Sequence, residues 1–150
     1  MIWKPHVTVA ALIEQAGKFL MVEERVDGML VLNQPAGHID PLESFLEAVA
    51  RETLEETGWL FTPTAITSIF YWKHPINDRQ FLRVCYKGCA SAPPGAVTLD
   101  TDIERTLWCS FDELEQLAEQ ENKLRSPMVM ASVRDYVAGK EFPLNLIQQL

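Results

Sequence analysis

The sequence has few cysteines, no long hydrophobic run and fewer basic than acidic residues. Its three cysteines form no C-x-x-C pair, which argues against a zinc site or a disulfide framework and favours reduced, buried thiols in a cytoplasmic protein. No segment approaches the ~20 apolar residues that cross a bilayer, and the N-terminus lacks the basic region and cleavage site of a secretory signal. Thirteen Lys+Arg against 21 Asp+Glu give a net charge of −8. This charge argues against a nucleic-acid polymer or an anionic membrane as the partner.

The composition is that of a globular protein, with 47% apolar, 23% charged and 9% aromatic residues. A chain of 150 residues fits one domain, and we find no repeat or Gly/Ser linker that would divide it. We therefore expect a single domain over residues 1–150. The sequence leaves a monomer and a homodimer equally open.

Apolar periodicity predicts strands in the first two-thirds of the chain and helices around and after them. Residues 6–15 and 18–24 are expected to form a hairpin that turns at Gly17, and residues 33–41 are expected to form a loop. Further strands are predicted at 66–73, 80–89 and 106–110, and helices at 44–58, 111–120 and 127–138. This order suggests a mixed sheet covered by helices, an α/β sandwich.

The helix at 44–58 has signals at both ends. Ser44 followed by Glu47 predicts a capping box, and Gly58 is placed to end the helix in the left-handed conformation. At 100° per residue, one side is expected to be the buried face. Its members are Leu46, Val49, Ala50, Thr53 and Leu54.

Three glutamates, Glu52, Glu55 and Glu56, share a different face of this helix at spacings i, i+3 and i+4. A solvated acidic surface is one interpretation. Arg51 can pair at i±4 with Glu47 and Glu55, which leaves Glu52 and Glu56 without a cation. Residues 37–58 contain six acids and one base, for a local charge of −5. A hard divalent cation, Mg²⁺ or Mn²⁺, takes oxygen ligands of this kind and can bridge them to phosphate.

The acidic helix lies in a longer pattern. Gly37, Glu43, Arg51-Glu52, Glu55-Glu56 and Gly58 fit the frame G-x5-E-x7-R-E-x-x-E-E-x-G, which resembles the signature of the Nudix hydrolases. The motif extends over 37–59, and Thr53 and Trp59 depart from its usual aliphatic residues. The resemblance implies an α/β/α sandwich with a mixed sheet and a loop–helix–loop catalytic motif.

The resemblance also implies Mg²⁺-dependent attack of water on a diphosphate linkage, with Mn²⁺ as a substitute ion. By position, Glu55, Glu56 and the carbonyl of Gly37 correspond to metal ligands. Glu52 corresponds to a further ligand or to the base that takes the proton of the attacking water. Glu43 and Arg51 correspond to the pair that orients the loop and helix.

Outside this motif, the stretches NQPAGH, FLR and LRSP and the C-terminal Tyr136 and Phe142-Pro143-Leu144 resemble the NudJ-type phosphatases. That similarity implies release of inorganic phosphate from nucleoside di- and triphosphates or from hydroxymethylpyrimidine pyrophosphate. Candidate substrate contacts each have a structural alternative, such as core packing, a salt bridge or simple solvation. They are His38, Phe70, Trp72, Arg83, Asp102 and Glu104.

Two other functions stay open. Pro75, sixteen residues after Trp59, is similar to a mark of the ADP-ribose and nucleotide-sugar pyrophosphatases, although a hairpin loop also accommodates a proline. A catalytically silent, Nudix-like ligand sensor is the alternative from another class. Such sensors usually lose motif acids or carry a DNA-binding extension, and neither feature is present here.

Overall fold

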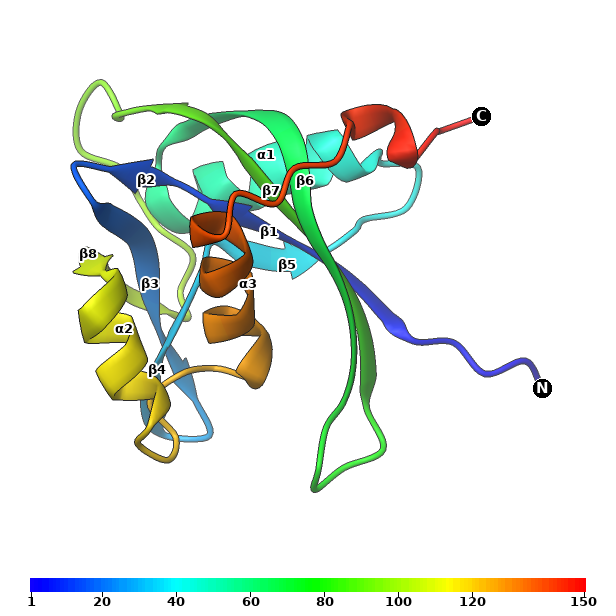
Figure 1. Cartoon of the computed structure of the whole chain (residues 1–150), viewed down its shortest axis with the longest axis horizontal. Helices are drawn as coiled ribbons and strands as arrows, with labels where there is room; N and C mark the ends of the chain where they lie inside the picture. The colour runs from blue at the N-terminus through cyan, green and yellow to red at the C-terminus, as the bar shows by residue number, and fades with distance from the viewer.

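Figure 1 shows a computed structural model that describes residues 1–150. Its elements form two four-stranded β-sheets and three α-helices. The strands are β1 (His6–Leu12), β2 (Glu14–Gln15), β3 (Lys18–Val26), β4 (Met29–Asn33), β5 (Ala36–His38), β6 (Leu60–Lys73), β7 (Gln80–Ser91) and β8 (Ile103–Ser110). The helices are α1 (Phe45–Thr57), α2 (Phe111–Ala118), α3 (Pro127–Val137) and the short 3₁₀ helix η1 (Leu144–Leu146).

The first sheet is mixed, as predicted. Its order is β5-β1-β7-β6, in which β1 and β7 are parallel and the other pairs are antiparallel. In the second sheet, β3 pairs antiparallel with β2, β4 and β8. The long hairpin of β6 and β7 extends away from the rest of the molecule at its turn (Figure 1).

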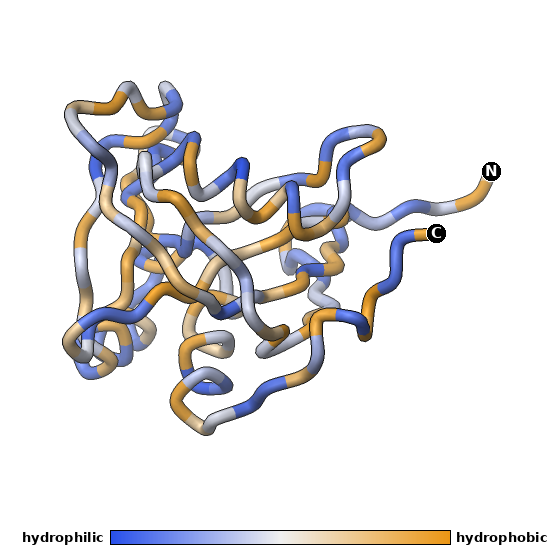
Figure 2. The backbone as a smooth tube through the Cα atoms, turned by 90° about the horizontal axis from the view of Figure 1, so that it is seen from above, coloured by the Kyte–Doolittle hydropathy of each residue, from blue (hydrophilic) through white to orange (hydrophobic).

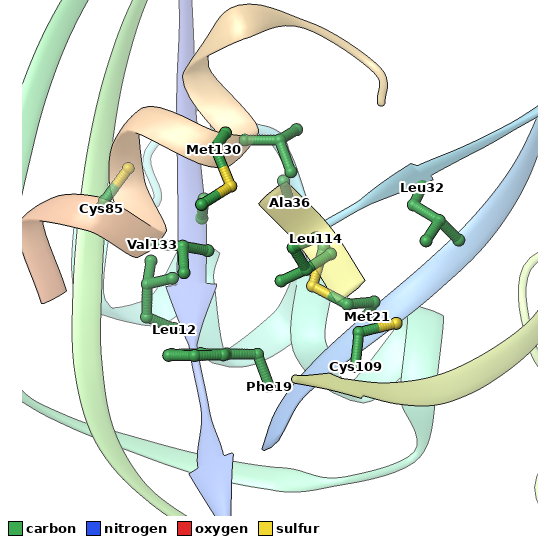
Figure 3. Packing of buried hydrophobic residues seen from close by; sticks show 12 residues of the cluster. Leu12, Phe19, Met21, Leu32, Ala36, Cys85, Cys109, Leu114, Met130 and Val133 are labelled. Carbon is green, nitrogen blue, oxygen red and sulfur yellow. The ribbon is translucent and has the colours of Figure 1, made fainter. Parts of the chain in front are cut away.

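Strand β1 contributes to two hydrophobic clusters. Val9 and Ala11 pack in one cluster with residues of α1, whereas Ala10 and Leu12 pack in the other with residues of α2 and α3. Figure 3 shows Val133 of α3 close to Leu12 in the second cluster. Because successive side chains of a strand point to opposite faces, helices cover β1 on both sides, and the predicted α/β/α sandwich is confirmed.

Hydrophobic segments run through the centre of the molecule, and both chain ends lie on the same side of it (Figure 2). None of the helices has the length and apolarity that a membrane-crossing segment requires.

Helix α1 begins and ends as its sequence predicts. The hydroxyl of Ser44 accepts a hydrogen bond from the Glu47 backbone N–H at 3.0 Å. Gly58 has φ of 76° and its N–H donates to the carbonyl of Leu54, which is an arrangement that favours glycine. The predicted return bond from the Glu47 side chain is absent, so the capping box is only half formed.

The predicted buried face of α1 is partly wrong. Leu46 and Leu54 are 38% and 47% exposed, whereas Val49 and Thr53 are fully buried. The helix is rotated so that Glu56 lies toward β5, where its carboxylate accepts a backbone hydrogen bond from Ala36. Because successive residues are 100° apart around the axis, spacing alone leaves the buried face uncertain by about one residue. The observed rotation buries Ala48 and Val49 and allows the bond from Ala36 to Glu56.

Two strand predictions also need correction. Residues 6–15 do not form one strand of a hairpin, because the chain changes sheets at the buried Ile13, and only Glu14–Gln15 pairs with β3. Residues 33–41, expected to be a loop, contain the short strand β5, which pairs with β1. Of the three thiols, Cys85 and Cys109 are buried as expected but Cys89 is exposed.

Candidate active site

Arg51 connects the loop before α1 to the helix itself. Its Nε donates to Oε1 of Glu43 at 2.6 Å and its Nη2 donates to Oε2 of the same carboxylate at 3.0 Å. Nη2 also donates to the carbonyl of His38 at 3.0 Å. A two-point contact of this kind fixes orientation as well as distance. Glu43 and Arg51 thus hold the loop against the helix.

Arg51 also reaches two of the three motif glutamates. Nη1 donates to Glu52 at 2.9 Å and to Glu55 at 3.1 Å. The expected pairing with Glu47 is wrong, and Glu52, expected to lack a cation, has one. The hydrogen bonds that Arg51 donates, first to Glu43 and then to Glu52, raise the pKa of its guanidinium, and Arg51 lowers the pKa of Glu43.

A group of three carboxylates forms where α1 meets the loop before β8. Oxygens of Glu52, Glu55 and Asp100 all lie within 4.8 Å of one another. The backbone N–H of Asp100 donates to the carbonyl of Glu55 at 3.1 Å, which anchors the loop on the helix. We name Glu52, Glu55 and Asp100 the carboxylate triad.

Gly37 lies against the triad. A Cβ at this position would lie 2.1 Å from the carboxylate carbon of Glu52, so any larger residue would require the Glu52 carboxylate to move. Gly58, at the other end of the helix, lies similarly close to the side chain of Val97, in the loop that carries Asp100. Both motif glycines therefore allow close packing around the triad.

Glu56 occupies a different place from the triad. Its side chain is 8% exposed, and its Oε1 accepts from the Ala36 backbone N–H at 2.8 Å. Burial raises the pKa of Glu56 to about 9, although the bond from Ala36 acts in the opposite direction. Glu56 is therefore not one of the three carboxylates of the triad, but it lines the same cavity as Asp100 and Gly37.

The electrostatics of the triad favour a cation. Burial raises the pKa of Glu52 to about 7, against the lowering effect of Arg51, and Glu55 and Asp100 add like charge. A positive ion nearby would stabilise the ionised carboxylates. Three carboxylate oxygens at this separation fit a hard divalent cation such as Mg²⁺, which takes oxygen ligands.

A cavity of about 430 Å³ lies beside the triad and is continuous with it through Asp100 and Gly37. Four predicted substrate contacts line it, namely His38, Trp72, Arg83 and Asp102. Glu104 does not, because Arg25 holds it at 2.9 Å on the exposed surface. Phe70 packs against the hydrophobic core, so for this residue core packing is observed in place of a substrate contact.

Aromatic rings form one wall of this cavity. Trp72 stacks on Phe81 with ring centroids 5.6 Å apart and an interplanar angle of 26°, and Phe81 stacks on His6. His6 also contacts His38 through a hydrogen bond of 3.0 Å between their ring nitrogens. Burial, followed by the charge of His6, lowers the pKa of His38.

Several lining residues were missed from the sequence. Asp100 lies two residues before the predicted Asp102, in a loop whose composition does not show which acid faces α1. Asn33, Arg79 and Arg125 also line the cavity. Arg79 lies in a hairpin turn and Arg125 directly before α3, so only the folded chain brings them together.

Comparison with known proteins agrees with this geometry. The family model described as "NUDIX domain" matches residues 4–130. The chain is 39% identical to the protein named Phosphatase NudJ of Escherichia coli (strain K12), over 97% of this chain and 92% of that protein.

Solved structures with the same fold have also been found. A NUDIX hydrolase from Nitrosomonas europaea has 44% sequence identity and a TM-score of 0.91, with 98% of both chains covered. The NUDIX domain of Shewanella oneidensis NrtR, solved in complex with ADP ribose, has 15% identity and a TM-score of 0.67, covering 91% of this chain and 90% of that one. At that identity the second similarity shows the fold alone. On the matched family model and the curated relative together, this chain belongs to the Nudix hydrolase family.

Proposed function

We propose that the protein hydrolyses a diphosphate linkage in nucleoside di- or triphosphates or in hydroxymethylpyrimidine pyrophosphate, with release of inorganic phosphate. The observation that carries this proposal is the position of the carboxylate triad at the edge of the aromatic-walled cavity, with Asp100 belonging to both. A ring can stack on the wall while its phosphates extend to the acids. The name of the Escherichia coli relative, Phosphatase NudJ, supports a reaction that releases phosphate.

The triad fits a divalent cation, and we propose Mg²⁺, with Mn²⁺ as a substitute. Glu52, Glu55 and Asp100 would hold it, with the carbonyl of Gly37 and the carboxylate of Glu56 as the further ligands expected from the motif. Such an ion, when bound, neutralises the charge of phosphoryl oxygens and makes water a better nucleophile.

The chain's own residues supply orientation and proton transfer. Glu52 or Glu55 accepts the proton of the attacking water, since both carboxylates lie in the triad and a positioned carboxylate can act as a general base. Arg51 contacts both at 2.9 and 3.1 Å and holds them in place. Glu43 fixes Arg51 in turn, at a distance from the reacting atoms.

A phosphate-release screen tests the proposal. Nucleoside di- and triphosphates, hydroxymethylpyrimidine pyrophosphate and ADP-ribose are compared with Mg²⁺, with Mn²⁺ and with EDTA. We expect inorganic phosphate from the first two groups, dependent on the metal. Separate Glu52→Gln and Glu55→Gln variants should each lower kcat by orders of magnitude, and Glu47→Gln, on the exposed side of the same helix, should not.

The alternative functions give different products. A pyrophosphatase would release AMP and ribose phosphate from ADP-ribose, or a nucleoside monophosphate and a sugar phosphate from another nucleotide sugar, in place of inorganic phosphate. A silent sensor would bind a ligand and turn over none of the compounds. Metal-independent phosphate release, or unchanged release by both glutamine variants, would contradict our assignment of the site.

We further infer that residues 1–150 act as one domain, since β1 belongs to both hydrophobic clusters. We propose that it functions in the cytoplasm, on small phosphorylated molecules and not on nucleic-acid polymers or membranes. Sedimentation would decide between the monomer and the homodimer.

A further inference from the structure

Arg83 is a buried cation with no carboxylate partner. It lies on β7 at the floor of the cavity and is 4% exposed. Its one hydrogen bond runs from Nη2 to Oδ1 of Asn33 at 3.0 Å, and its Nε has no partner. A buried donor without a partner is unfavourable in a folded protein. Glu24 and Glu56 act on the charge of Arg83 from a distance, without a hydrogen bond to it.

The partner of Arg83 is itself held in one orientation. Asn33 is 6% exposed, and its Nδ2 donates to Oε1 of Glu24 at 3.1 Å. The amide therefore directs its nitrogen to Glu24 and its oxygen to the guanidinium. The other oxygen of Glu24 lies 3.5 Å from Nε of Arg125, which also lines the cavity.

The choice of an amide at position 33 has an electrostatic consequence. An aspartate there would also accept from Arg83, but it would cancel the charge of the guanidinium and repel Glu24. Asparagine orients Arg83 without placing a negative charge in direct contact with the guanidinium. Burial accordingly lowers the pKa of Arg83, since a charge removed from water is stabilised only by an opposite charge.

Arg83 lies between the two parts of the cavity. It is opposite Thr8 on β1, which is opposite His38 on β5, so the three residues form one row across the sheet. The next row on the same face holds Phe81 and Trp72 of the aromatic wall. Phosphates that extend from a ring at this wall toward the triad would pass close to Arg83.

We propose that Arg83 binds an anionic phosphoryl oxygen of the substrate through the side of its guanidinium that lines the cavity, and that Asn33 is the positioning residue that holds this guanidinium without neutralising it. The inference rests on the proposed function and names the group that the site recognises. Because every candidate substrate carries a diphosphate, this contact accounts for recognition of the phosphate chain regardless of the attached ring.

Binding of methylenediphosphonate, a diphosphate analogue with a P–C–P bridge that is not hydrolysed, tests the role of Arg83. Affinity is measured by calorimetry at a fixed Mg²⁺ concentration. We expect Arg83→Gln to bind about 10- to 100-fold more weakly, the usual effect of losing a hydrogen bond to a charged group. Arg105→Gln is the matched control, because Arg105 pairs with Glu23 on the surface and its loss changes the net charge equally.

A second set of variants keeps Arg83 in place. Asn33→Asp should weaken binding by a similar factor, because the new carboxylate neutralises the guanidinium. The Asn33→Asp, Glu24→Gln double variant restores the hydrogen bond between the two side chains with the donor reversed. We expect this double variant to stay at least about tenfold weaker than Glu24→Gln alone. Recovery to the affinity of Glu24→Gln would show that Asn33 acts through geometry only and would overturn its assigned role.

Thermal unfolding of every variant shows which of them are folded. If Arg83→Gln does not fold, Asn33→Asp and Arg83→Lys test the proposal in its place. Arg83→Lys keeps the charge and should bind more tightly than Arg83→Gln. Equal affinity of Arg83→Gln and the native chain, or no measurable binding by the native chain, would overturn the proposal. Turnover does not enter this measurement, so its result is independent of the phosphate-release screen.

Discussion

The carboxylate of Glu52 occupies the space in which a side chain at Gly37 would begin. One residue belongs to α1 and the other to β5, and their contact sets how closely the strand approaches the helix. Gly37→Ala should therefore displace Glu52 from the triad. We expect kcat to fall on the order of 100-fold, since small misplacements of catalytic groups have effects of that size. Steady-state kinetics measures the change.

Gly95→Ala is the matched control for this substitution. Gly95 has no neighbour within 4 Å of an added Cβ and no left-handed backbone, so the variant should have native activity. Native activity in Gly37→Ala would mean that the position of Glu52 is not required.

Asp100 is the acid of the triad that lies outside the motif. Asp100→Asn removes one of the three negative charges. We expect metal affinity to fall about 10- to 100-fold, because loss of a group that only supports a metal ligand already has an effect of that size. Mn²⁺ binding followed by electron paramagnetic resonance measures this affinity. Asp102→Asn is the comparison, because Asp102 lines the cavity outside the triad. A larger effect at Asp102, predicted from sequence as a substrate contact, would contradict the assignment of Asp100 to the metal site.

Arg51→Lys tests the two-point contact with Glu43. Lysine keeps the charge but cannot bond both carboxylate oxygens in this geometry. We expect the free energy of unfolding to fall by about 1–3 kcal/mol, as for hydrogen bonds between charged groups, measured by urea denaturation. Arg25→Lys, at the exposed pair with Glu104, should change it by less than about 1 kcal/mol. Equal changes at both sites would show that the Arg51 contact adds no stability.

The three thiols should differ in reactivity. Cys89 is exposed, whereas Cys85 and Cys109 are buried. Burial raises the pKa of Cys85 to about 11 and raises that of Cys109, so at pH 8 both hold fewer reactive thiolates. We expect a thiol reagent to label one cysteine rapidly in the native protein and all three in denaturant. Cys89→Ser should abolish the rapid phase, and its persistence would contradict the fold around β7.

Local signals predicted α1 and most of the motif geometry. The Ser44 cap and the Gly58 terminus depend on contacts within a few residues, and the sequence shows them directly. The grouping of Glu52 with Glu55 likewise follows from helical spacing. The rotation of the helix does not, because it depends on contacts with distant segments, such as the bond from Ala36 on β5 to Glu56.

Features that depend on distant segments were missed or misplaced. Asp100 lies next to Glu55 because of the path of a long loop. The composition of that loop does not show whether Asp100 or Asp102 is the acid that lies beside α1. Arg83 could be identified as a candidate because a charged residue stands among apolar neighbours on a strand. Its amide partner Asn33, fifty residues away, carries no comparable signal, since asparagine is common in loops and at strand ends.

The turn of the β6–β7 hairpin extends away from the rest of the molecule (Figure 1), yet His74, Asn77 and Arg79 from this turn line the cavity. This part of the cavity and the glutamates of α1 therefore come from separate stretches of the chain. A longer or shorter turn in this hairpin would change which molecules can enter the cavity and would leave the glutamates of α1 in place. In a fold arranged in this way, changes in the hairpin can alter which molecules bind while the glutamates of α1 stay the same.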